Sequence, residues 1–173
     1  MADTAVFRAP HEIWTADTCE PLDDAWQRGE VRLEAYARGT YPGVALPDET
    51  LPGLKTVGFW DAPRDQPWGL DWHRNEGIEI TYLAKGRVGF ATGRGAWRLR
   101  GGDLTITRPW QRHRVGSPNI DACRLHWLMI DVGIRRPQQP WQWPSWVVLS
   151  EPDLERLTEL LRHCEEPVWR GGT

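Results

Sequence analysis

Long apolar runs, paired cysteines and an excess of positive charge are all missing from this sequence of 173 residues. No apolar stretch approaches the roughly 18 residues that a membrane-spanning helix needs, so we expect no membrane contact. The net charge of −3 provides no general attraction to nucleic acid. The three cysteines, Cys19, Cys123 and Cys164, show no metal-binding spacing and make an odd set. With no secretory leader, they indicate a reducing, cytoplasmic location.

The main pattern in the sequence is a series of short segments between glycines in which apolar and polar residues alternate. From Gly69 to Gly116, apolar and polar residues alternate as in half-buried antiparallel strands. Ile78 and Ile80 share one face of such a strand, whereas Glu79 and Thr81 share the other. We therefore expect four or five hairpin-connected strands here, with turns at three glycine-containing sites: Gly86, Gly93 to Gly95, and Gly101-Gly102.

The flanking sequence suggests a barrel between an arm and a helix. Residues 1–24 show little periodicity and are expected to form an N-terminal arm. Residues 25–149 would form the barrel, with further strands at Trp26–Tyr36, Leu54–Trp60 and Ala122–Val132. Residues 150–173 begin with the potential N-cap Ser150 and predict a C-terminal α-helix. Its apolar stripe consists of Leu154, Leu157, Leu160 and Leu161.

Two groups of residues resemble the cupin motifs. His73, Asn75, Glu79 and Gly86 resemble the first motif, with Asn75 in the place of its second histidine. Gly102-Asp103, Pro109 and His113 resemble the second. The resemblance implies a mainly β cupin fold, a double-stranded β-helix or jelly roll, with the C-terminal helix added to it.

A narrower resemblance covers roughly Gly69 to Gly133. The segments GIEITYLAKGRVGF and WRLRGGDLTITRPWQRHRVG look like the N-terminal effector-binding and dimerisation domain of AraC-type transcription regulators. This resemblance implies a small-molecule effector in the barrel, a homodimer formed through the C-terminal leucines, and an arm able to close over the effector. Nothing after Trp169 could supply the helix-turn-helix units of that family, so we expect DNA binding only through a domain that is not present in this chain.

The inward phase of the predicted strands identifies candidate ligand-binding residues. A small barrel points alternate side chains into its cavity, which suits a polar molecule held in an aromatic pocket. The 12 tryptophans favour a carbohydrate, because a flat indole can cover the C–H face of a sugar ring. The candidates on the strands are Asp71, His73, Asn75, Glu79, Thr81, His113 and Trp127. Trp14 joins them from the arm, which the resemblance implies can close over the effector.

A metal-dependent enzyme of the cupin type is the alternative function. His73, Glu79 and His113 could hold a divalent metal and leave positions open for a substrate. Asn75 is a poor ligand for iron or zinc, although three protein ligands can suffice for a catalytic metal. We therefore predict a sensor without catalysis and without a required cofactor, and keep the metalloenzyme open as the second reading.

Overall fold

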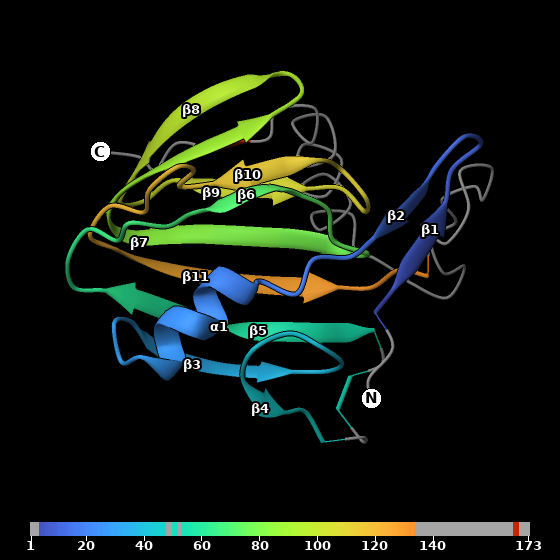
Figure 1. Ribbon diagram of the computed structural model, residues 1–173, viewed down its shortest axis with the longest axis horizontal. Coiled ribbons are helices and arrows are strands. Elements are labelled where there is room, and N and C mark those ends of the chain that lie inside the picture. Colours follow the sequence, from blue (N-terminus) through green and yellow to red (C-terminus); the bar gives the residue numbers. More distant parts are fainter. Residues whose placement is uncertain (1–3, 48–49, 52, 134–167, 170–173) are drawn as a thin grey trace, which may run out of the picture.

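The computed structural model describes residues 4–47, 50–51, 53–133 and 168–169. Within them one helix, α1 (Glu20–Gln27), accompanies a fold made almost entirely of strands (Figure 1). The strands are β1 (Val6–Arg8), β2 (Ile13–Thr15), β3 (Arg32–Ala37), β4 (Val44–Ala45), β5 (Leu54–Ala62), β6 (Leu70–His73), β7 (Ile78–Thr92), β8 (Gly95–Arg100), β9 (Leu104–Thr107), β10 (His113–Val115), β11 (Cys123–Ile130) and β12 (Val168–Trp169). The predicted mainly β jelly roll is confirmed.

The barrel is organised around β7, which takes part in both of its walls. The main run of strands has the order β12-β9-β7-β11-β5-β3-β4, and β8 and β10 pair with β7 while β6 pairs with β10. The first half of β7 pairs with β9 and β11, and its second half pairs with β8 and β10. Figure 1 shows β7 running beneath the β8 and β10 ribbons and above β11.

Gly86 lies inside β7, so the predicted hairpin turn at this position is wrong. The strand passes through Gly86 with φ +85° and carries an irregularity there: Arg124 pairs with Lys85, whereas Leu125 pairs with Leu83. A Cβ atom at Gly86 would lie 2.2 Å from the carbonyl oxygen of Ala122. Glycine is therefore required for a bulge, not for a turn. The turns predicted near Gly93 and Gly101 do separate β7, β8 and β9.

The core lies between the two walls of the barrel and is lined by the alternate residues of each strand. Leu83 and Val88 on β7, Leu99 on β8 and Leu125 on β11 are at most 4% exposed. Leu22 and Ala25 of α1 join the same cluster, so the short helix closes part of the core. Its sequence suits a helix start, because Pro21 lies in the first turn together with Glu20 and Asp23.

The N-terminal arm is more ordered than the sequence predicts. Residues 1–24 were expected to lack regular structure, yet β1 and β2 form an antiparallel pair and α1 begins at Glu20. Phe7 stacks on Trp14 with ring centroids 4.8 Å apart and also contacts Trp110. The arm is thus anchored by aromatic contacts, including one with a residue far away in the sequence. Such contacts leave no periodic pattern in so short a segment.

The strands predicted outside the central hairpins agree with the sequence apart from their bounds, whereas α1 and β4 were not predicted. The strand predicted at Trp26–Tyr36 begins only at Arg32, because α1 includes Trp26. β5 and β11 match the strands predicted at Leu54–Trp60 and Ala122–Val132 to within two residues. The predicted C-terminal helix and its leucines lie outside the described residues. Within the described part of the chain, no helix has the length and apolar character to cross a membrane.

Candidate functional site

A pocket opens between β5, β6, β7 and β11, with α1 and the loop after β3 on its rim. The cavity is small, with about 40 Å³ of space for the centres of water molecules. The whole empty volume, including open solvent at the mouth, is about 530 Å³. The enclosed end therefore accepts a group of a few atoms, and a larger molecule would extend towards the mouth. The lining residues are Cys19, Leu22, Tyr41, Pro42, Thr56, Trp60, Leu70, His73, Asn75, Glu79, Thr81, Val115, Leu125, Trp127 and Met129.

Five of the eight predicted ligand-binding residues line this pocket. His73 ends β6, Asn75 lies in the β6–β7 loop, Glu79 and Thr81 begin β7, and Trp127 lies on β11. Strand alternation explains why these residues line the pocket, because Glu79 and Thr81 share the inward face that the sequence predicts. Trp127 has its indole nitrogen fixed: Nε1 donates to Thr56 Oγ1 at 3.0 Å.

His113 lies behind the pocket rather than in its wall. It is 1% exposed and is not among the lining residues. Its ring centroid is 4.1 Å from that of His73, because His113 at the start of β10 pairs with His73 at the end of β6. Its predicted direct contact with a ligand is therefore corrected to a contact with Glu79 and His73.

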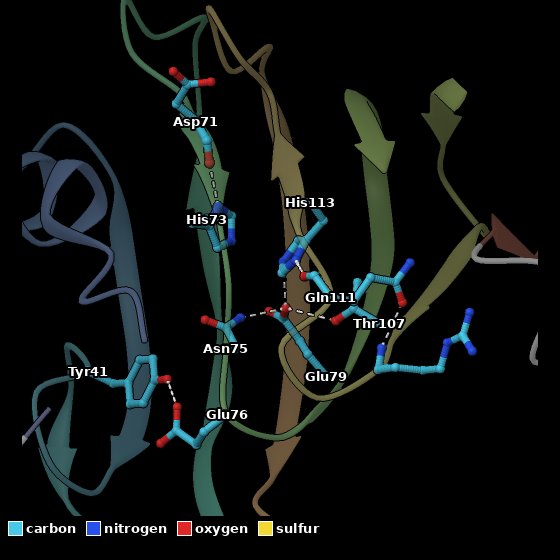
Figure 2. A network of polar contacts seen from close by, with 10 residues as sticks. Tyr41, Asp71, His73, Asn75, Glu76, Glu79, Thr107, Gln111 and His113 are labelled. Carbon is cyan, nitrogen blue, oxygen red and sulfur yellow. Dashed lines mark hydrogen bonds and ion pairs between the residues drawn. The ribbon is translucent and has the colours of Figure 1, made fainter. Parts of the chain in front are cut away.

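Asp71 and Trp14 lie outside the pocket. Asp71 is exposed, and its side chain accepts a long hydrogen bond from Ser117 Oγ at 3.4 Å. Only its backbone carbonyl reaches the site, through His73 (Figure 2). Trp14 lies on β2, where it contacts Phe7 and the Arg74 guanidinium, 3.8 Å from the ring centroid. The placement of Asp71 in the cavity by strand phase is wrong, because β6 turns its side chain outward. Trp14 of the arm packs on Phe7 and not on the pocket.

A polar network converges on Glu79 (Figure 2). Its Oε2 accepts hydrogen bonds from Asn75 Nδ2 at 2.9 Å and from Thr107 Oγ1 at 3.5 Å. His113 Nε2 lies 3.1 Å from the same oxygen, although the angle is poor for a hydrogen bond. Attraction between charges depends mainly on their separation, so the two groups still interact at this distance.

The contact between Glu79 and His113 depends on a proton. Nδ1 of His113 faces the carbonyl oxygen of Gln111 at 2.9 Å, and a carbonyl can only accept, so Nδ1 carries a hydrogen. Without a further proton, Nε2 would present a lone pair to a carboxylate oxygen at 3.1 Å, which is repulsive. The contact is therefore attractive only when a proton lies between these two atoms.

The network changes the pKa values of two pocket residues. Burial alone would raise the pKa of Glu79, but the contact with His113, the charges of both histidines and the Asn75 hydrogen bond together lower it. Burial, followed by the nearby charge of His113, lowers the pKa of His73. At neutral pH the pocket thus contains an ionised or proton-sharing Glu79 beside a neutral His73.

A second buried cluster supports the rim of the pocket. Glu76 is 1% exposed, accepts a hydrogen bond from the Tyr41 hydroxyl, and lies 3.1 Å from Lys55 Nζ. The Glu76 charge and burial raise the pKa of Tyr41, burial being the larger cause. Tyr41 lines the pocket from a loop rich in Pro and Gly, where no sequence pattern indicates it. Trp60 was also missed, although Thr56, Gly58 and Trp60 alternate inward on β5.

The three residues of the metalloenzyme alternative lie next to one another, and each is held by contacts within the protein. His73 and His113 both bind a backbone carbonyl through Nδ1, which is the usual support for a metal-binding histidine. However, Glu79 Oε2 already receives Asn75 and Thr107. No group of three His, Cys, Asp or Glu side chains among the described residues has metal-holding geometry.

Comparison with known proteins identifies the family. A family model described as the AraC-like ligand binding domain matches residues 62–161, which is more than half of the chain. The chain belongs to the AraC-like ligand binding domain family. This span includes the two cupin-like motifs and every strand from β6 to β11. No curated protein sequence matches the chain.

Some solved structures are similar to this AraC-like domain at low sequence identity. A predicted oxalate decarboxylase from Thermotoga maritima is 18% identical, with a TM-score of 0.38 over 46% of this chain and 69% of its own. A cupin superfamily protein from Desulfitobacterium hafniense is 10% identical, with a TM-score of 0.39 over 57% and 77%. An uncharacterised double-stranded β-helix protein from Klebsiella pneumoniae is 18% identical, with a TM-score of 0.37 over 52% and 85%. The activities named for these proteins belong to them.

Proposed function

We propose that this AraC-like domain is the sensor of a cytoplasmic transcription regulator and that it binds a small polyhydroxylated effector, a carbohydrate or a fragment of one. The observation that carries the proposal is a single pocket in which His73, Asn75 and Glu79 lie together with the indole rings of Trp60 and Trp127. Polar groups at one end can orient hydroxyls, and the flat rings can cover C–H faces.

The proposed domain works by binding and not by catalysis. Its polar groups hold one another: Asn75 and Thr107 bind Glu79, and His113 Nε2 lies 3.1 Å from it. Such a network favours a fixed recognition surface over a reactive group. DNA binding would come from a helix-turn-helix domain outside these residues, and effector binding would be reported through a homodimer.

A ligand screen with two matched tryptophan variants tests this proposal. Thermal shift against neutral sugars, polyols and their amino and acid derivatives would identify binders, and calorimetry would measure them. We expect Trp127→Ala to weaken binding of any hit about tenfold, since an aromatic contact is worth up to about 1.5 kcal/mol beyond buried area.

Trp72→Ala is the matched control. Trp72 neighbours His73 in β6 but contacts Arg112 and Arg114 on the outer side of the barrel, each 5.0 Å from its ring centroid. The Trp72→Ala variant should bind any ligand found in the screen with unchanged affinity. Equal losses in the two variants, or none in either, would remove this pocket as the effector site.

A further inference from the structure

The pocket is lined by side chains with hydrogen-bond acceptors that have no donor among the described residues. The Asn75 amide nitrogen must face Glu79 Oε2, because a carboxylate oxygen in this contact accepts the hydrogen bond at 2.9 Å. The amide oxygen Oδ1 therefore points the other way. Asn75 is 4% exposed, and its Oδ1 is buried with no hydrogen-bond partner in the described part of the chain. A buried acceptor of this kind is costly unless something donates to it.

His73 supplies a second acceptor. Its Nδ1 lies 2.5 Å from the backbone carbonyl oxygen of Asp71 (Figure 2). Since that oxygen can only accept, Nδ1 carries the hydrogen and Nε2 is left with a lone pair in the neutral ring. Glu79 adds the second oxygen of its carboxylate, Oε1, because Oε2 already receives Asn75 and Thr107. Three acceptor side chains therefore line the same pocket.

Few groups in the pocket can donate. No Lys or Arg is found among the described lining residues. The Tyr41 hydroxyl donates to Glu76, and the Trp127 indole donates to Thr56. Lys55 is paired with Glu76 and does not line the pocket. A carboxylate or phosphate would therefore be desolvated here without a charged partner, at considerable cost.

The aromatic walls favour a cation in the same place. Trp60, Trp127 and Tyr41 all line the pocket, and the faces of such rings attract ammonium groups, most strongly where water is excluded. A primary ammonium group has three N–H donors and no acceptor. It matches the three acceptors in number and finds no competing donor among them.

We propose that the pocket selects a ligand whose buried end is a primary ammonium group, as in an amino sugar or an amino alcohol. This inference rests on the proposed function, because it names the chemical class of the effector for the same site. The polyol part of such a ligand would lie towards the mouth, where the empty volume widens into solvent.

Three probes of nearly equal size test the proposal. They are 3-amino-1,2-propanediol, glycerol and glycerate, which place an ammonium, a hydroxyl or a carboxylate on the same diol. Each is titrated into the full chain, with chelator present so that no metal can bridge. The readout is the indole N–H resonance of Trp127, assigned with Trp127→Phe. We expect the amine to bind about tenfold more tightly than glycerol, a difference of about 1.4 kcal/mol, and glycerate not to bind.

Two carboxylate variants sharpen the test. Glu79→Gln replaces an acceptor oxygen with a donor, so the amine should lose its advantage over glycerol. Asp71→Asn is the control, because it neutralises a carboxylate that is close in sequence but exposed and outside the pocket. In this variant the amine should still bind more tightly than glycerol. Circular dichroism would check that both variants fold, and the ranking of the three probes on the unmodified chain stands whether or not they do.

The outcomes separate this inference from the proposed function. If glycerate or glycerol shifts the Trp127 resonance at concentrations equal to or below those of the amine, the ammonium proposal is overturned and the pocket remains a ligand site. If none of the probes shifts it up to the solubility limit, both proposals fail. The ranking amine, then glycerol, with no binding of glycerate, supports both.

Discussion

Glu79 keeps its pKa below the usual 4.5 although it lies in a mostly buried site. In the unfolded chain the carboxyl titrates near that usual value. Its stabilising contribution is therefore complete above pH 4.5 and is lost as the pH falls through the lower folded-state value. We expect urea unfolding to show a steeper loss of stability below pH 4.5 in the unmodified chain than in Glu79→Gln. Parallel pH profiles would contradict this account of the network.

His73 affects stability in a different pH range. Burial lowers the pKa of its ring below 6.5, so the unfolded chain binds a proton more readily than the folded one. Stability should therefore fall as the pH drops below 6.5 and level off above it. His73→Gln should reduce this loss between about pH 6.5 and 5, by the same linkage. His126→Gln is the control for the removal of a histidine. The His126 ring lies outside the pocket and contacts Phe59 and Tyr82.

Residue by residue, the site was predictable where strands alternate and unpredictable elsewhere. Glu79, Thr81 and Trp127 follow from period-two patterns in β7 and β11. Tyr41, Glu76 and Lys55 do not, because their contacts join a loop, a turn and a strand that are far apart in the sequence. Strand phase also misplaced Asp71, since β6 covers only Leu70–His73 and its inward face is not maintained along the whole strand.

At the scale of elements, the bulge in β7 should depend on Gly86. Gly86→Ala places a Cβ atom 2.2 Å from a backbone oxygen, at φ +85°, and should destabilise the fold by at least about 1–3 kcal/mol. Gly89→Ala lies in the same strand with nothing within 4 Å of the new atom. It should change stability by less than about 0.5 kcal/mol. Chemical denaturation of the two variants compares them directly, and a similar small effect for both would argue against a strained bulge.

The long strands are the elements that the sequence predicts correctly. β5, β7 and β11 have enough alternation to be recognised, and only their ends differ. The helix α1 was missed although Glu20, Pro21 and Asp23 form a helix-start signal, because eight residues hold too few turns to show a periodic apolar face. β1 and β2 have three residues each, too short for any pattern to be distinguished from chance.

At the scale of the whole molecule, the proposed dimer can be tested through the predicted C-terminal stripe. Leu157→Glu with Leu161→Glu would place two charges on its apolar face, and sedimentation should then show monomers. Arg162→Glu with His163→Glu, on the opposite side of the predicted helix, should leave the dimer intact. A dimer that persists in the leucine variant would place the interface elsewhere on the barrel.

The continuity of β7 has a consequence for how the barrel assembles. One strand supplies hydrogen bonds to β9 and β11 and, further along, to β8 and β10. Neither wall can be completed before β7 is in place, and β11 reaches it only after a long stretch of chain. The two walls should therefore form and open together, in one cooperative and comparatively slow step. Amide hydrogen exchange would then give similar opening free energies at both ends of β7.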